Sequence, residues 1–171
     1  FYKSIRKANI SLANIHKNKE LTERETRYFR GRAYFLRAYF YFYLVRMYGP
    51  VPILPDTPFE TDMNVGSVSF ERNTYDECVA KICADFEEAA RLMPQDRIES
   101  QQYLPTKGAA LAFKARMQLY AASPLFNGNT YYATWKNSMG ENFISQEESK
   151  TKWAKAAATF KRLIDMDAYK L

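Results

Sequence analysis

The chain has 171 residues, of which 47% are hydrophobic and 26% charged, so its composition is that of a folded globular protein and not of a disordered one. Six glycines are few for a sheet protein with many tight turns, which favours helices. The net charge of +6 is uneven, because residues 1–50 hold 11 Lys and Arg against 3 Asp and Glu.

Two helices are predicted at the start of the chain. Over residues 2–15, side chains suited to a buried face recur every three to four positions. They are Ile5, Ala8, Asn9, Leu12 and Ile15. Thr22 and Glu25 have the spacing of a capping box, so a second helix is predicted from there to Tyr48.

The second half of this second helix is unusually apolar. Between residues 33 and 48 only Arg37 and Arg46 interrupt a run of aromatic and aliphatic side chains. A helix that is apolar on nearly all sides must be surrounded by other elements. The run is shorter than the roughly 20 residues that a bilayer requires, so we interpret it as a central core helix. Gly49 and the following proline end it.

The middle of the chain combines a long loop with two further helices. Residues 49–73 are rich in Pro, Asp, Gly and Ser, and a loop of this length is often functional. Thr74 and Glu77 form a second capping box, which opens a helix that ends at Met93. A fourth helix is predicted over residues 107–122.

A second long loop, at about residues 124–145, precedes the last helix. Ser145 and Glu148 have capping spacing and predict its start. Its buried stripe is expected at Trp153, Ala156, Ala157, Phe160, Leu163 and Ile164. Alanine clusters in the fourth and fifth helices allow backbones to approach closely, which favours stacked helix pairs. We therefore predict one all-α domain over residues 1–171, made of antiparallel helix pairs of a degenerate tetratricopeptide-like type with long loops.

Several segments, in chain order, resemble the SusD/RagB family of outer-membrane nutrient-binding lipoproteins. Residues 33–53 read AYFLRAYFYFYLVRMYGPVPI and are similar to the family's signature helix and following turn. Residues 106–116, TKGAALAFKAR, and residues 121–127, AASPLFN, resemble two further family segments. Pro50 departs from the family, which often has Asp or another polar residue there.

The resemblance implies a non-catalytic, helical protein without a cofactor that captures glycans or other nutrients. It would be anchored by lipid at the outer-membrane surface and would cap a SusC-like TonB-dependent β-barrel for import. The chain starts at Phe1 within a helical pattern and carries neither a signal peptide nor a lipid-anchor cysteine. We therefore expect it to be part of a larger SusD-like protein.

The second long loop is the best candidate for ligand binding. A sugar stacks its apolar face on an aromatic ring, while amide, carboxylate or guanidinium groups fix its hydroxyls. This loop gathers such side chains, namely Asn127, Asn129, Tyr131, Tyr132, Trp135 and Asn137. The alternative interpretation is that Tyr131 and Trp135 fold back and fix the loop on the core.

Other functions have less support. An intracellular helical-repeat adaptor that binds a protein partner is the main alternative. Catalysis by the loop acids Asp56, Glu60 and Asp62 is disfavoured because nothing fixes their spacing. With one histidine and no Cys-x-x-Cys pattern, a metal site is not expected. Nucleic-acid binding is ranked last, because the loop aromatics are not interleaved with Lys or Arg.

The basic first half has two interpretations. It could bind phosphates or acidic sugars. Alternatively, its charges could pair with acidic parts of a larger protein.

Overall fold

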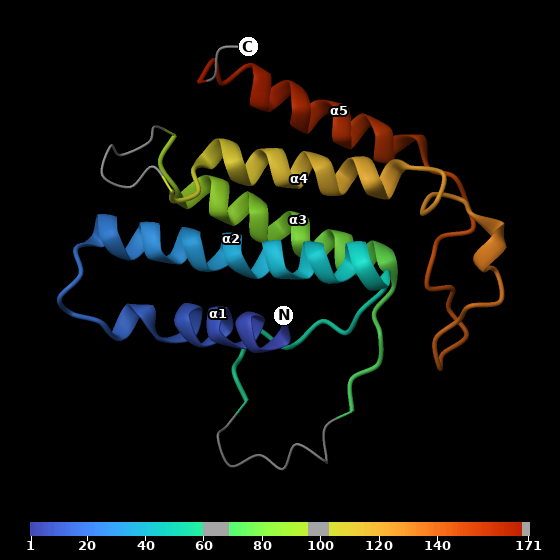
Figure 1. Cartoon of the computed structure of the whole chain (residues 1–171), viewed down its shortest axis with the longest axis horizontal. Helices are drawn as coiled ribbons and strands as arrows, with labels where there is room; N and C mark the ends of the chain where they lie inside the picture. Colours follow the sequence, from blue (N-terminus) through green and yellow to red (C-terminus); the bar gives the residue numbers. More distant parts are fainter. Residues whose placement is uncertain (60–68, 96–102, 169–171) are drawn as a thin grey trace.

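The computed structural model describes residues 1–59, 69–95 and 103–168, and these residues contain α-helices, short 3₁₀ turns and no strand (Figure 1). The helices are α1 (Tyr2–Asn14), α2 (Glu23–Tyr48), α3 (Tyr75–Leu92), α4 (Lys107–Ala122) and α5 (Lys150–Ile164). Each helix lies antiparallel to the next in the chain and packs against it, from α1 at the bottom of Figure 1 to α5 at the top. The predicted all-α architecture of antiparallel helix pairs is confirmed.

Side chains cap three of the four long helices that follow α1, and the caps of α2 and α3 are those predicted from sequence. The Thr22 hydroxyl accepts from the Glu25 backbone N–H, and the Glu25 carboxylate accepts from the Thr22 N–H at 2.9 Å. Thr74 and Glu77 repeat this capping box at α3. The Thr106 hydroxyl caps α4. At its other end α2 stops as predicted, with Gly49 in a positive-φ conformation of 69°.

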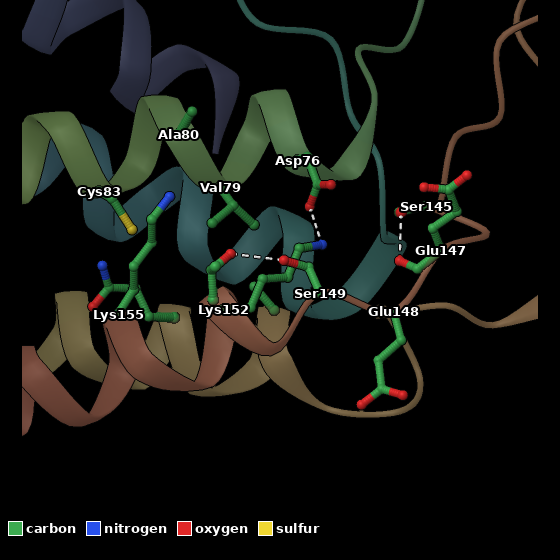
Figure 2. Close-up of a pocket in the computed structure, with 13 residues that line it drawn as sticks. Asp76, Val79, Ala80, Cys83, Ser145, Glu147, Glu148, Ser149, Lys152 and Lys155 are labelled. Carbon is green, nitrogen blue, oxygen red and sulfur yellow. Dashed lines mark hydrogen bonds and ion pairs between the residues drawn. The ribbon is translucent and has the colours of Figure 1, made fainter.

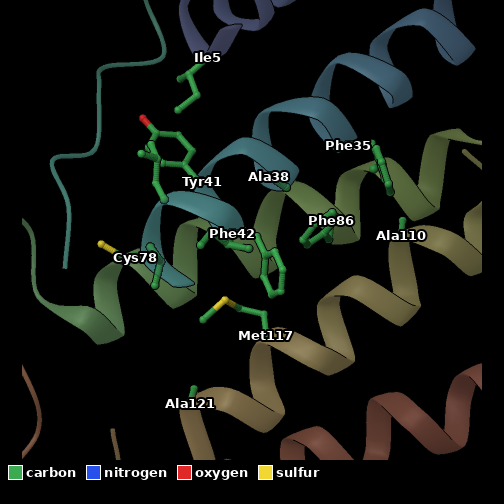
Figure 3. Close-up of a cluster of buried hydrophobic side chains, with 14 of the residues drawn as sticks. Ile5, Phe35, Ala38, Tyr41, Phe42, Cys78, Phe86, Ala110, Met117 and Ala121 are labelled. Atoms are coloured by element: carbon green, nitrogen blue, oxygen red, sulfur yellow. The ribbon is translucent and has the colours of Figure 1, made fainter. Parts of the chain in front are cut away.

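The core lies between α2, α3 and α4, with α1 closing one side (Figure 3). Phe42 and Phe86 are fully buried, and Phe113 of α4 packs edge-on to Phe42 with ring centroids 5.6 Å apart. Small side chains such as Ala38 and Ala110 are also fully buried and allow the helices to approach. The aromatic run of the second predicted helix therefore forms the centre of the core.

The prediction that α2 is surrounded on nearly all sides is wrong for one face. Leu36, Met47 and Tyr48 are 46%, 61% and 57% exposed. The reason is the arrangement of the helices: α1 and α3 cover α2 extensively, whereas α4 touches it at few positions. One stripe of α2 consequently stays uncovered by the described residues.

The start and the buried face of the fifth helix also differ from the prediction. The helix begins at Lys150, and its N-cap Ser149 makes no side-chain capping hydrogen bond. Ala156 and Thr159 face α4 and are buried, while Trp153 and Ile164 are 45% and 71% exposed. The backbone of α5 packs closely on α4 only, which buries a narrow face, so the wide stripe expected from sequence is only partly covered.

Two further properties concern membranes and metals. No helix in the described part of the chain combines the length and the apolar character needed to cross a membrane. Within residues 1–59, 69–95 and 103–168, no group of three or more His, Cys, Asp or Glu side chains is placed to hold a metal ion.

Candidate functional site

The aromatic side chains of the second long loop form a series of rings from the core to the surface. Trp135 packs on buried Phe143 with centroids 5.0 Å apart, and Tyr132 lies 6.0 Å from Trp135. Tyr131 follows, edge-on to Tyr132 at 5.2 Å, and is 85% exposed. Trp135 thus folds back on the core, whereas Tyr131 points into solvent with its ring free to stack on a ligand.

Two of the predicted asparagines hold the loop in shape. The buried Asn127 amide donates to the Ser149 carbonyl at 3.2 Å and accepts from the Ser149 N–H at 2.8 Å. Asn129 accepts from the Tyr131 N–H at 3.1 Å and donates to the Leu125 carbonyl. These amides satisfy backbone groups that a loop otherwise leaves without partners.

Asn137 has a similar structural role in the next turn. Its Oδ1 accepts from the backbone N–H groups of Met139 and Glu141, at 3.0 and 2.9 Å, and its Nδ2 donates to the Glu141 carboxylate. The structure therefore brings the three predicted aromatic residues together, while the three asparagines are engaged in shaping the loop that carries them.

The second loop also contacts the first, which the sequence did not indicate. The Ser138 hydroxyl donates to the Glu71 carboxylate at 2.6 Å, across 67 positions of sequence. A Cβ placed on Gly49 would lie 3.8 Å from the Trp135 ring, so this ring lies against the end of α2. Exposed Tyr48 lies beside Gly49 in sequence. The two loops and the end of α2 thus form one surface with exposed rings and a carboxylate.

An apolar cavity of about 410 Å³ is lined by the end of α2, by Tyr75 at the start of α3, and by the end of α4 with the turn that follows it. Its walls include Phe42, Tyr120 and Phe126, with the Arg46 guanidinium and the Ser123 hydroxyl among its polar groups. Aromatic faces with a few polar groups are the chemistry that recognises sugars. This cavity was missed because its residues come from three distant segments.

A buried ionic cluster joins α1, α2, α3 and the first loop. The Arg37 guanidinium binds Asp85 through Nε and Nη2, both at 2.7 Å, and its Nη1 donates to Asn9 and Asp56. Lys81 also binds Asp56, at 2.6 Å. Burial acts to raise the pKa of Asp56, but the hydrogen bond from Lys81 and the charge of Arg37 outweigh it and lower that pKa.

This cluster bears on the acids that were considered for catalysis. Asp56 forms ion pairs with Arg37 and Lys81, so its carboxylate joins helices and the first loop. Glu60 and Asp62 lie outside the described residues. The two cysteines are free thiols, Cys78 buried and Cys83 partly buried.

Another cavity, of about 580 Å³, lies between α3, α4 and α5 (Figure 2). Lys152 of α5 spans it to bind Asp76 of α3 at 2.6 Å. Among the described residues no aromatic ring lines this cavity, so a neutral sugar would find no face on which to stack. The aromatic surface made by the two loops is the better candidate for glycan binding.

Comparison with known proteins identifies the class. Residues 1–119 match the model of a SusD-like family described as starch-binding and associating with the outer membrane. This match covers more than half of the chain, so the chain belongs to the SusD-like family. The family consists of carbohydrate-binding proteins without catalytic activity.

Individual relatives agree with this assignment. SusD-like protein P38 of Formosa agariphila is 32% identical over 120 residues, which is 70% of this chain and 22% of P38. The solved structure of BT4246 is 29% identical, with a TM-score of 0.86 over 98% of this chain and 29% of its own. A laminarin-binding SusD-like protein has the same fold, at 22% identity and a TM-score of 0.64, over 83% of this chain and 31% of its own. The chain therefore spans less than a third of the length of these relatives.

Proposed function

We propose that this chain is the helical part of a larger, non-catalytic glycan-binding protein at the outer-membrane surface. The protein is anchored by lipid and acts with a SusC-like TonB-dependent β-barrel that imports the captured glycan. Membership of the SusD-like family supports this proposal. In this proposal residues 1–171 form one helical domain that positions the two long loops.

The observation that carries glycan binding is the exposed aromatic surface of the second loop. Tyr131 offers a solvent-facing ring at 85% exposure, and Tyr132 and Trp135 support it from below. In this proposal the rings contact the sugar, and Asn127, Asn129 and Asn137 complete the site by holding the loop in shape. Glu71 of the first loop lies beside Ser138, and its carboxylate supplies an acceptor for hydrogen bonds from the hydroxyl groups of a sugar.

The test is a titration of the purified chain against a panel of neutral glycans, including starch and laminarin. Tyr131→Ala removes the exposed ring and should weaken binding by about 1–2 kcal/mol, or roughly 5- to 30-fold. Tyr103→Ala is the matched control, because Tyr103 is 82% exposed and lies between α3 and α4, outside this surface. The glycan should be recovered at its original length after incubation.

Two results would count against the proposal. One is the absence of binding to every glycan in the panel. The other is equal weakening by the Tyr131 and Tyr103 substitutions, which would mean that the second loop has no special part in binding.

A further inference from the structure

The outer face of α1 is a continuous basic stripe. At 100° per residue, positions 3, 6, 7, 10 and 14 fall on one side of the helix, opposite the buried Ile5, Ala8 and Asn9. These positions are occupied by Lys3, Arg6, Lys7, Ile10 and Asn14, and Lys17 continues the line in the 3₁₀ turn. We call Lys3, Arg6, Lys7 and Lys17 the α1 basic stripe.

No acidic group within the described residues neutralises this stripe. α1 contains no Asp or Glu, and none of the four cations forms an ion pair with a described residue. The Lys17 ammonium donates to the neutral Asn14 amide at 2.7 Å. Lys3, Arg6 and Lys7 are three and four positions apart, a spacing at which like charges repel one another and disfavour the helix.

The rest of the molecule contrasts with this stripe. Asp85, Glu87 and Asp76 each bind one or two cations from neighbouring helices. These three acidic side chains of α3 therefore join helices, whereas the cations of α1 point away from the molecule. An outward row of unneutralised cations is complementary to an anionic ligand.

We infer that the α1 basic stripe binds a linear acidic polysaccharide, whose carboxylate or sulfate groups pair with Lys3, Arg6, Lys7 and Lys17. The inference rests on the proposed glycan-binding function and adds the class of glycan. Along the helix axis the stripe is about 21 Å long at 1.5 Å per residue, so it presents its charges in a row as a linear polyanion does.

A membrane surface fits α1 less well than a polysaccharide. A helix that lies on a membrane inserts an apolar face into the lipid, beside its basic residues. The apolar face of α1 is buried against α2, and the stripe itself offers only Ile10, at 37% exposure. The binding energy of the stripe must therefore come from charge.

The experiment measures binding of the chain to dextran sulfate and polygalacturonate, with neutral dextran as the reference polymer. One triple variant, K3Q/R6Q/K7Q, removes three charges of the stripe. The control triple, R116Q/K150Q/K155Q, removes three exposed charges of α4 and α5 and has the same net charge. Circular dichroism verifies that both variants keep their helices.

The expected result is binding of both acidic polymers and not of dextran. The stripe variant should bind at least about tenfold more weakly at about 50 mM salt, and the slope of log K against log salt should flatten by about 2 to 3. The control triple should change affinity by less than about threefold, because its charges lie away from the contact.

Equal loss of affinity in the two triple variants would overturn the inference, because it would show an effect of net charge alone. Binding of phosphatidylglycerol vesicles through the stripe, without binding of either acidic polymer, would also overturn it. The proposed function is tested separately by Tyr131→Ala on neutral glycans. A negative result for the α1 basic stripe therefore does not affect the test of neutral glycan binding, and a negative result for neutral glycans does not affect the test of the stripe.

Discussion

Replacement of Asp85 by Asn should destabilise this protein more than any other single carboxylate substitution in the Arg37 cluster. Asp85 is 3% exposed and accepts two hydrogen bonds of 2.7 Å from Arg37, which is 2% exposed. The substitution leaves the buried guanidinium without its main counter-charge. Breaking a buried pair in this way costs about 3–5 kcal/mol, against a total stability of about 5–15 kcal/mol.

The matched substitution is Asp56→Asn, which removes the other carboxylate bound to the same guanidinium. The Asp56 side chain is 65% exposed and makes one contact to Arg37. Solvent screens such a pair, so its loss should cost only about 0–1 kcal/mol. The difference between the two substitutions isolates burial as the cause, because both remove one negative charge and keep a similar shape.

Urea unfolding followed by circular dichroism at 222 nm gives the free energy of unfolding for each variant. A third variant, R37M/D85L, removes both buried charges and should be more stable than Asp85→Asn alone, since no charge is left without a partner. If Asp56→Asn were as damaging as Asp85→Asn, or if the double variant were the least stable, the reasoning from burial would be refuted.

Three further predictions concern a turn, the thiols and acid stability. Gly128 has φ +82°, and a Cβ at this position would lie 2.8 Å from the Glu148 backbone nitrogen. Gly128→Ala should therefore lower the free energy of unfolding by about 1–3 kcal/mol and lower Tm. An unchanged Tm would contradict this close contact. Burial raises the pKa of Cys78 and of Cys83 to about 11. Iodoacetamide should therefore label both thiols slowly at neutral pH in the folded chain and quickly in urea. Rapid labelling of the folded chain would contradict their burial. Burial acts to raise the pKa of Asp56, but Lys81 and Arg37 outweigh it, so the pKa is lower in the folded chain than the unfolded value of 3.8. The ionised Asp56 therefore contributes stability above pH 3.8, and this contribution is lost as pH falls through the lower folded pKa. The stability of Asp56→Asn should depend less steeply on pH in this acid range than that of the unsubstituted protein, and an identical acid profile would count against the pairing of Asp56 with Lys81 and Arg37.

The sequence was sufficient to predict the helices whose signals are local. The Thr22–Glu25 and Thr74–Glu77 boxes are confirmed because both partners lie within one turn of the same helix. The predicted start of α5 at Ser145 was wrong, although Ser145 and Glu148 have the same spacing as the two confirmed capping boxes. Ser149 and its neighbours are held by the Asn127 amide from another segment, so a tertiary contact decides where the helix begins.

The candidate site was predictable only in part, for the same reason. Aromatic composition correctly indicated that Tyr131 and Trp135 belong to one loop, but not that Trp135 turns inward and Tyr131 outward. The roles of the asparagines depend on backbone groups that need partners in the folded loop. The hydrogen bond between Ser138 and Glu71 joins the two loops through residues 67 positions apart, so no local sequence pattern predicts it.

The most direct test of the proposed function is to identify what this protein binds in its own bacterium. The tagged protein is purified from gently solubilised outer membranes, and its partners are identified by mass spectrometry. We predict a large TonB-dependent β-barrel in stoichiometric amount. A protein found only in the cytosol with a soluble partner would contradict this function and favour a helical-repeat adaptor.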